Sequence, residues 1–362
     1  MSEKIIWGPG ARFLFLAASA VVVVAGLRAA APILLPFSLA LFLAILSLPI
    51  MFALKRKGVP TSIAILIAVL IDLAIFGVLV LLVTQSVADF QERLPQYVRR
   101  FQNLYAAWID NLQDRGIPAG EFLSTELISV SAILDFAGGT LTRIASFLSN
   151  AFLVILVMVF ILAEAVVFPQ KFRAVLGQGD TQDVSRFAKI TGEVQEYLVI
   201  KTLVSVATGL SIGLWAWIMG LDFPILLGLI GFVLNYVPTI GSILAAIPAM
   251  LLALIQTGSL GLVAVVAVGY GGINLVFGNL IEPQLLGRRL GLSTLVVILS
   301  LLFWAWVWGP VGALLAVPLT MVVKIGLENT QDLRWIALLL DKEPPPQAEA
   351  AGPASIDTDE GV

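Results

Sequence analysis

Residues Asn235 to Pro248 read NYVPTIGSILAAIP, and they lie inside a run of 59 residues, Phe223 to Ile281, without any Asp, Glu, Lys or Arg. A second uncharged run, Leu290 to Val323, has 34 residues and reads WGPVGALLAVP from Trp308 to Pro318. The two stretches align as an internal repeat. The matching residues are Gly241 with Gly312, Leu244 with Leu315, Ala245 with Ala316, Pro248 with Pro318 after a one-residue gap, and the prolines before each glycine, Pro238 and Pro310.

The lengths of these runs predict helices that are broken in the middle. A membrane helix needs about 20 apolar residues to cross about 30 Å of hydrocarbon. A straight helix of 34 residues would measure about 50 Å, which is too long for one crossing and short for two. Two shorter arms joined by unwound backbone at a Pro-Gly site resolve the mismatch. Such breaks in corresponding positions of two repeats point to a transporter binding site, whereas a tilted helix with a packing kink is the alternative.

The composition is that of a membrane protein. The chain has 362 residues, of which 59% are hydrophobic and 12% charged, and its mean hydropathy is +1.00. Soluble domains have about 25% charged residues. We therefore predict an all-α polytopic membrane protein with about eight hydrophobic segments, two of them broken or re-entrant helices that form an inverted repeat. The net charge of −3 says little about partners, because the residues from Asp341 onward contain six acids and one base.

The predicted organisation has five parts. Residues 1–84 hold three transmembrane helices, the first read as retained rather than as a cleaved signal. A polar amphipathic insert on the outer side spans 85–144, and 145–200 holds the fourth transmembrane helix and a cytoplasmic amphipathic connector. Residues 201–326 form the transport core with both broken helices. A cytoplasmic C-terminal tail covers 327–362 and is expected to be disordered from about 343, where it becomes rich in Pro, Ala and acids.

Basic residues set the orientation, because they favour the cytoplasmic side. Four plain crossings place Lys4, Arg12 and the cluster Lys55 to Lys57 on that side. Arg288 and Arg289 join them only if the run after Asp222 begins with a re-entrant hairpin. This arrangement puts the N- and C-termini in the cytoplasm and makes the two hairpins enter from opposite faces.

Within the insert, apolar residues recur at alternating spacings of three and four. The stripe is Val87, Phe90, Leu94, Tyr97, Phe101, Leu104 and Trp108. Such a narrow stripe favours a subunit interface, and we expect a homo-oligomer formed through the helix at 85–115 and through transmembrane faces. A helix lying on the bilayer or packing on its own chain is the alternative.

The sequence has few groups suited to catalysis. The chain has no Cys and no His, which removes thiolate metal sites, disulfides and the commonest metal ligand and proton shuttle. Lys201 is the one candidate base at membrane depth and has no evident partner in the sequence. Asp72 is the only aspartate well inside an apolar crossing, so an aspartyl dyad is not formed. We therefore expect no enzyme, no metal, no cofactor and no nucleic-acid partner.

Other polar and broken positions define a candidate solute path. Its neutral donors and acceptors suit a small polyhydroxylated or zwitterionic solute. The predicted path residues are Asn235, Pro238, Thr239, Gly241, Ser242, Pro248, Asn274, Asn279, Glu282, Pro283, Gly309, Pro310, Gly312 and Pro318. Asp72 and Glu164 lie deepest among charged residues in the apolar crossings and are candidates for ion coupling, although a structural hydrogen bond or an interfacial position explains them as well.

The chain resembles the autoinducer-2 exporter family of bacterial permeases over residues 31–323. The resemblance rests on APILLPFSLALFLAILSLP with KRKG after it, VQEYLVIKTLVSVATG around Tyr197, NYVPTIGSILAAIPAMLLAL, IEPQLLGRRLGLS at Glu282-Pro283, and WGPVGALLAVPL. It implies a multi-pass transporter of the bacterial cytoplasmic (inner) membrane that is homo-oligomeric and contacts lipid. Family members are linked to autoinducer-2 export, and others to sodium/proton antiport.

The function expected from these observations is export of a small polar organic solute by alternating access. A monovalent cation/proton antiporter that uses Asp72, Glu164 or Glu282 is the first alternative. A membrane scaffold that presents the insert to partners without transporting anything is the second.

Overall fold

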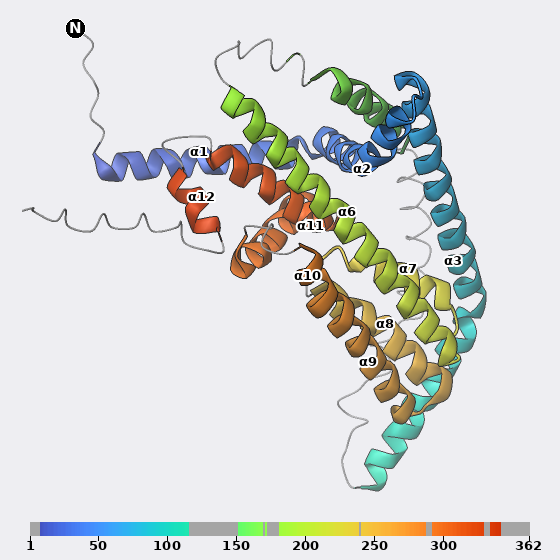
Figure 1. The fold of residues 1–362 in the computed structure, drawn as a ribbon. Helices are drawn as coiled ribbons and strands as arrows, with labels where there is room; N and C mark the ends of the chain where they lie inside the picture. Colours follow the sequence, from blue (N-terminus) through green and yellow to red (C-terminus); the bar gives the residue numbers. More distant parts are fainter. Residues whose placement is uncertain are drawn as a thin grey trace, which may run out of the picture.

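The computed structural model describes residues 8–115, 151–168, 171, 181–238, 240–286, 292–328 and 334–341. Every regular element in these ranges is a helix, which confirms the predicted all-α class (Figure 1). The elements are α1 (Pro9–Ala29), α2 (Ala31–Arg56), α3 (Thr61–Asp114), a helix at Ala151–Phe168, α6 (Thr181–Ile218), α7 (Pro224–Leu234), α8 (Ile240–Thr257), α9 (Leu260–Asn274), the π-helix η2 (Leu275–Ile281), α10 (Glu282–Leu286), α11 (Thr294–Glu328) and α12 (Arg334–Leu340).

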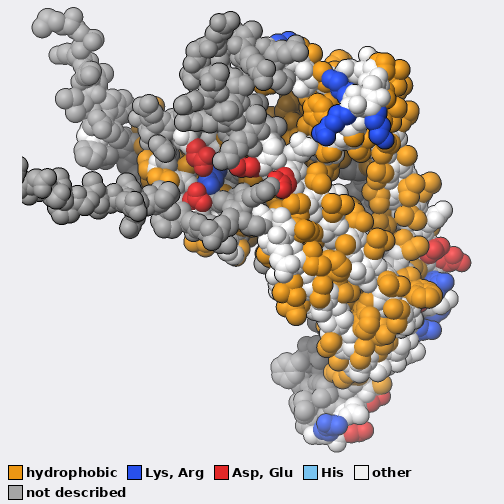
Figure 2. Space-filling model, in the orientation of Figure 1, with side chains coloured by type: hydrophobic (Ala, Val, Ile, Leu, Met, Phe, Trp, Pro, Cys, Tyr) orange, Lys and Arg blue, Asp and Glu red, His pale blue; other side chains and the backbone are white. Residues whose placement is uncertain are grey.

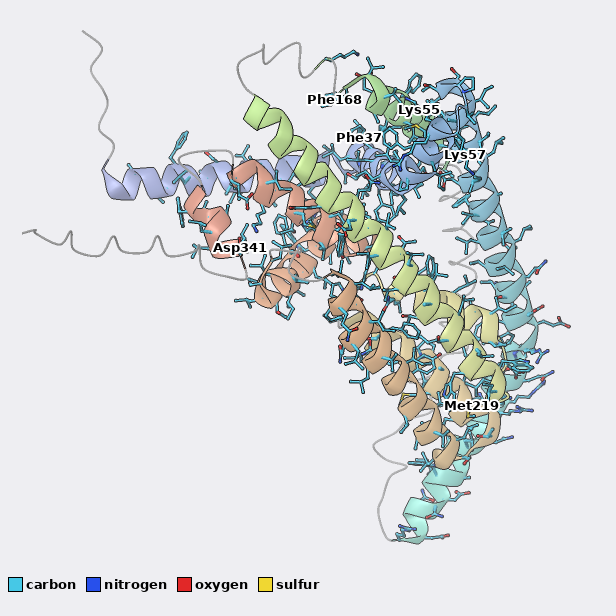
Figure 3. All side chains as sticks on the ribbon, in the orientation of Figure 1. Phe37, Lys55, Lys57, Phe168, Met219 and Asp341 are labelled. Carbon is cyan, nitrogen blue, oxygen red and sulfur yellow. The ribbon has the colours of Figure 1, made fainter. Side chains whose placement is uncertain are left out.

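The surface of this helical assembly is that of a membrane protein. Within the described residues, seven helices are long and apolar enough to cross a membrane. Large apolar side chains point outward along them, for example Ile33 at 75% exposed and Phe152 at 74%. Figure 2 shows hydrophobic side chains over most of the described surface on this face, with the charged ones gathered in a few small groups. Lys55 and Lys57 lie at one end and Met219 at the opposite end (Figure 3). The predicted multi-pass membrane protein is therefore confirmed.

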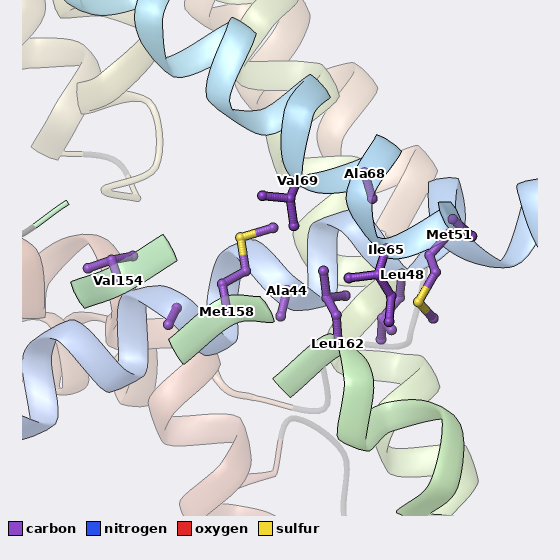
Figure 4. Close-up of a cluster of buried hydrophobic side chains, with 11 residues drawn as sticks. Ala44, Leu48, Met51, Ile65, Ala68, Val69, Val154, Met158 and Leu162 are labelled. Atoms are coloured by element: carbon purple, nitrogen blue, oxygen red, sulfur yellow. The ribbon is translucent and has the colours of Figure 1, made fainter. Parts of the chain in front are cut away.

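A scaffold of α2, α3 and the helix Ala151–Phe168 packs around small residues. Its buried cluster includes four alanines that are at most 1% exposed, namely Ala40, Ala44, Ala64 and Ala68 (Figure 4). Small side chains let membrane helices approach closely, which is how such helices gain packing energy without a hydrophobic driving force. Ser47 of α2 lies in this interface and donates a hydrogen bond to Asp72 of α3. Asp72 thus has a partner between two scaffold helices.

Helix α3 continues far beyond the membrane crossing. It has 54 residues and runs through Pro95 without ending, so it measures about 80 Å. The first part of the predicted apolar stripe is buried within the same chain, with Val87, Leu94 and Tyr97 at most 9% exposed. The helix touches α7 and α8 there, whereas Trp108 near its end is 57% exposed. The stripe therefore packs at least partly on its own chain, and an oligomer interface stays a prediction.

Helix α6 forms the axis of the second half of the molecule. The predicted connector and the predicted fifth crossing are one continuous helix of 38 residues. At its middle, Tyr197 and Leu198 pack with Val317 and Met321 of α11. Nearer its C-terminal end, Ile212 packs in a cluster with residues of α7 and α8. Two different parts of the core are thus attached to successive parts of one helix.

The described end of the chain folds back onto this core. The Ser293 N–H group, just before α11, donates to the Leu340 carbonyl oxygen of α12 at 3.1 Å. The Lys324 Nζ atom lies 3.1 Å from Asp341 Oδ2 and 3.5 Å from Glu328 Oε1. The predicted disorder beyond residue 343 and the insert beyond residue 115 lie outside the described residues.

Candidate functional site

Helices α7 and α8 form a hairpin whose two ends meet. The side chain of Gln256 closes its base, because its Oε1 atom accepts from the Asp222 N–H group at 3.1 Å and its Nε2 atom donates to the Gly220 carbonyl oxygen at 2.9 Å. Helix α7 has 11 residues, which is about 16 Å and half of a bilayer core. The chain therefore enters and leaves this hairpin at the same depth along the membrane normal.

Helix α11 is a second hairpin. Its backbone departs from helical geometry at Gly309, where φ is 66° and ψ is −150°. A positive φ of this kind is freely available to glycine and strained for other residues. Across the bend, the Trp304 Nε1 atom donates to Thr320 Oγ1 at 3.0 Å. Residues 16 positions apart would lie about 24 Å apart in a straight helix, so the chain doubles back at Gly309.

Both hairpins use a glycine to bring their arms together. A Cβ atom at Gly241 would overlap the carbonyl oxygen of Leu234, in the last turn of the preceding arm. A Cβ atom at Gly312 would overlap the carbonyl oxygen of Trp304 in the same way. The sequence repeat that aligned Gly241 with Gly312 thus corresponds to the same glycine-dependent close contact between arms in both hairpins.

The turns of the two hairpins lie in the same part of the molecule. Val237, in the first turn, packs against the hydrophobic cluster around Trp304 and Trp308 of the second hairpin. The Trp308 Nε1 atom also donates to the Leu27 carbonyl oxygen of α1 at 3.0 Å. The bases lie at different levels along α6, since the first packs near Ile212 and the second near Leu198. The hairpins therefore approach each other tip to tip.

Polar side chains of α6 hold the first turn. The Asn235 Nδ2 atom donates to Ser205 Oγ at 3.0 Å, and both residues are buried. The hydroxyl group of Tyr236 donates to Thr202 Oγ1 at 2.8 Å. Uncharged hydroxyl and amide groups of this kind can both donate and accept, so they can exchange their bonds for bonds to a polyhydroxylated solute.

A buried ion pair lies beside these contacts. The Lys201 Nζ atom is 2.6 Å and 2.8 Å from the two carboxylate oxygens of Glu282. The side chains are only 3% and 16% exposed. The sequence gave Lys201 no evident partner, because Glu282 follows 81 residues later and begins a different helix. That expectation was wrong: packing of α10 on α6 supplies the partner.

The part of α3 around Arg93 and Tyr97 is fixed to the base of the first hairpin. Arg93 Nη1 lies 2.9 Å from Asp222 Oδ1, and the Tyr97 hydroxyl donates to the same carboxylate. The Arg93 guanidinium also lies 5.6 Å from the ring centre of Phe223. Phe223 begins α7 with φ at 58°, a strained value for a bulky residue that the surrounding contacts must hold in place.

The structure brings some of the predicted path residues to the hairpin turns and places the others elsewhere. Those at the hairpin turns are Asn235, Pro238, Gly241, Gly309, Pro310 and Gly312, with Ser242, Glu282 and Asn274 half-buried along the adjoining helices. Pro248, Asn279 and Pro283 are exposed, Pro318 is half-buried in the second arm, and Thr239 lies outside the described residues. Among the described residues, no three acidic side chains gather into a metal site.

The two ion-coupling candidates lie elsewhere. Asp72 is bound to Ser47 in the scaffold, and Glu164 pairs with Lys171 at 2.8 Å with its side chain 52% exposed. Sequence reasoning considered Lys201 only as a candidate base and did not single out Thr202, Ser205 or Tyr236. A polar residue every three or four positions within an apolar crossing, as at 201, 205 and 208, is a signal that could have marked Lys201 and Ser205.

Comparison with known proteins assigns the family. The profile described as AI-2E family transporter matches residues 14–332, which includes both hairpins and α6. The chain belongs to the AI-2E transporter family. The AI-2 transport protein TqsA of Escherichia coli K12 is 38% identical over 94% of this chain and 98% of its own length. A putative transport protein of Haemophilus influenzae is 40% identical over 89% of this chain and 94% of its own length.

A more distant relative is named for a different activity. A sodium-lithium/proton antiporter of Halobacillus andaensis is 26% identical over 86% of this chain and 94% of its own length. AI-2E family membership makes this chain a multi-pass membrane transporter, and the resemblance noted from the sequence motifs is confirmed.

Proposed function

We propose that this AI-2E family protein exports a small polar organic solute, of the autoinducer-2 type, across the bacterial inner membrane. The observation that carries the proposal is that two hairpin turns meet beside the buried polar side chains of α6. Asn235, Tyr236, Thr202 and Ser205 offer neutral hydrogen-bonding groups there. The name of TqsA, an AI-2 transport protein, supports a solute of this class.

Alternating access is the mechanism that best suits this arrangement. Free backbone groups at a helix break face protein or a wet cavity rather than lipid, and two breaks that meet tip to tip can seal a site from either side. The first hairpin would open to the outside, because its base is fixed to Asp222 and to the outer part of α3. The second would open to the cytoplasm, where the basic cluster Lys55 to Lys57 also belongs.

Efflux from sealed vesicles tests the solute. Purified protein is reconstituted, the vesicles are loaded with autoinducer-2, and its loss is followed with protein-free vesicles as the blank. Asn235→Ala removes an amide that binds Ser205 at 3.0 Å, and we expect efflux to fall about tenfold, as for a lost hydrogen bond of about 1.5 kcal/mol.

Asn103→Ala is the matched control, because Asn103 is exposed on α3 and is not among the predicted path residues. Efflux should stay within about twofold of wild type, as for a surface change worth under 0.5 kcal/mol. Folded protein that gives no efflux above the blank would contradict the proposed solute. Equal efflux from the two Asn variants would contradict the proposed position of the site.

A monovalent cation/proton antiporter is the second candidate. The Halobacillus relative is named as such an antiporter. Glu282 is a buried carboxylate that suits an antiporter. An imposed sodium gradient would then change the internal pH of the same vesicles in the absence of any organic solute. We expect no such change, and its appearance would place the antiporter first.

A further inference from the structure

Holding α6 against α10 does not by itself explain why Lys201 and Glu282 form a buried ion pair. Two charges removed from water must regain the lost hydration, so a buried pair is weak support for stability compared with apolar packing. Ionisable groups at membrane depth are costly and mark functional positions. Lys201 lies in the apolar span Gly192–Ile218, and both of the carboxylate oxygens that it contacts belong to Glu282.

The backbone that carries Glu282 is irregular. The seven residues before it form the π-helix Leu275–Ile281, and the Glu282 N–H group donates to the carbonyl oxygen of Phe277, five residues back. Single π-helical turns interrupt α-helices most often at functional sites. Pro283 follows directly and has no N–H group to donate to the preceding turn. Glu282 is thus placed on a segment whose hydrogen bonding can rearrange.

The pair is directly connected to the proposed solute site. Thr202, which binds Tyr236, is the next residue after Lys201, and Ser205, which binds Asn235, lies one turn farther along the same face of α6. A shift of α10 relative to α6 would therefore disturb the hydrogen bonds that hold the first hairpin turn.

A row of buried polar atoms continues from the pair along the α6–α9 contact. Thr208 Oγ1 and Trp215 Nε1 on α6 and the Tyr270 hydroxyl on α9 are buried and have no hydrogen-bond partner among the described residues. Thr208 and Trp215 follow Lys201 at heptad-like spacing on one face of α6. Nearly all buried polar groups in proteins are paired with protein or with water. Trp215 Nε1 lies directly against Gly269 of α9, where an added Cβ atom would overlap it, so these three atoms are unpaired polar groups in a closely packed helix contact.

We propose that Glu282 carries the coupling proton of the transport cycle and that Lys201 is its fixed counter-ion. The inference rests on the proposed export function. A proton from water on one side binds a Glu282 carboxylate oxygen, the ion pair becomes an ammonium group beside a neutral acid, and the same proton later leaves to the other side.

The protonated state favours movement. Once Glu282 is neutral, the buried Lys201 ammonium has lost its counter-charge and gains by turning toward the hydroxyl and amide groups around Thr202 and Ser205, or toward a bound solute. Tyr197 on α6 borders the pair and interacts with Glu282 and with Tyr236 of the first turn. Lys324 on α11 is paired elsewhere, with Asp341 of the chain end.

The test compares coupled accumulation with simple exchange, using autoinducer-2 in vesicles that contain the full-length protein. Counterflow of labelled solute at equal internal and external pH measures exchange. A gradient of about one pH unit measures coupling, because one coupled proton then supports a concentration ratio of about ten. For Glu282→Gln we expect accumulation to fall to a ratio of about one and the pH profile of counterflow to become flat. Glu92→Gln, an exposed acid on α3, is the matched control and should keep the accumulation ratio.

The outcomes separate the ideas. Accumulation by Glu282→Gln at the wild-type ratio would overturn the proton role. A purely structural pair gives a different result. Glu282→Gln would then lose both counterflow and accumulation, and the double variant Lys201→Met with Glu282→Gln would recover gradient-driven accumulation. That outcome would also overturn the proton role. Recovery of counterflow without accumulation in that double variant would support the proton role even if the single variant folds poorly. Absence of counterflow in folded wild-type protein would overturn the export function itself.

Discussion

Substituting the two hairpin glycines by alanine tests the central feature of the transport core. At Gly241 the added Cβ atom would overlap the Leu234 carbonyl oxygen and lie 2.7 Å from its carbonyl carbon. At Gly312 it would overlap the Trp304 carbonyl oxygen and lie 2.8 Å from that carbon. Ordinary van der Waals contact begins at 3.4 Å, so the two arms must separate by more than half an ångström.

Separating the arms has the free-energy cost of an overpacked core. Overpacking a core costs about 1–3 kcal/mol, and the upper end applies here because a backbone carbonyl cannot rotate away as a side chain can. About 3 kcal/mol corresponds to roughly a hundredfold change in an equilibrium constant. If the closely packed hairpin is the form that transports, Gly241→Ala and Gly312→Ala should each reduce autoinducer-2 efflux by between ten- and a hundredfold, to order of magnitude.

The matched control is Gly272→Ala. Gly272 lies in α9 with nothing within 4 Å of an added Cβ atom, and alanine in a helix interior is favoured over glycine by about 0.5–1 kcal/mol. We expect wild-type efflux from this variant. Size-exclusion profiles and thermal midpoints of all three proteins in detergent report whether they remain folded. If Gly241→Ala and Gly312→Ala transport as well as Gly272→Ala, the close approach of the arms is not needed and the reasoning fails.

Two further predictions concern the surroundings of the core. Asp72→Asn should lower efflux by less than about threefold, because an amide oxygen still accepts the hydrogen bond from Ser47; complete loss of efflux would instead make Asp72 an ion-coupling group. Gln256→Leu removes two hydrogen bonds at the base of the first hairpin, worth about 1 kcal/mol each. Its thermal midpoint in detergent should fall below that of Gln102→Leu, an exposed control on α3, and equal midpoints would contradict closure of the base.

Much of the fold follows from the chain alone, because bilayer thickness fixes the length of a crossing. The break at Gly309 and the matching of Gly241 with Gly312 came from counting apolar residues and comparing two short strings. Both features have local causes, namely a glycine or proline within a long apolar run. Local causes are visible in sequence.

The features that were missed depend on which helices meet. Lys201 and Glu282 are 81 residues apart, and nothing in either segment records that α10 packs on α6. The apolar stripe of α3 has the same pattern whether it meets another subunit or the hairpin base, and in the structure Tyr97 binds Asp222 of its own chain. Periodicity shows that a face is covered without showing what covers it.

The short first arm of the α7–α8 hairpin has a consequence for biogenesis. A helix of 11 residues, about 16 Å long, offers the insertion machinery no complete crossing to release into lipid. Outside the folded protein, Asn235, Tyr236 and the unwound backbone between them and α8 would face hydrocarbon, at several kcal/mol for each unsatisfied group. Thr202 and Ser205 of α6 satisfy those two side chains. We therefore expect α6 to act as the template on which the hairpin is installed after its neighbours have entered the membrane.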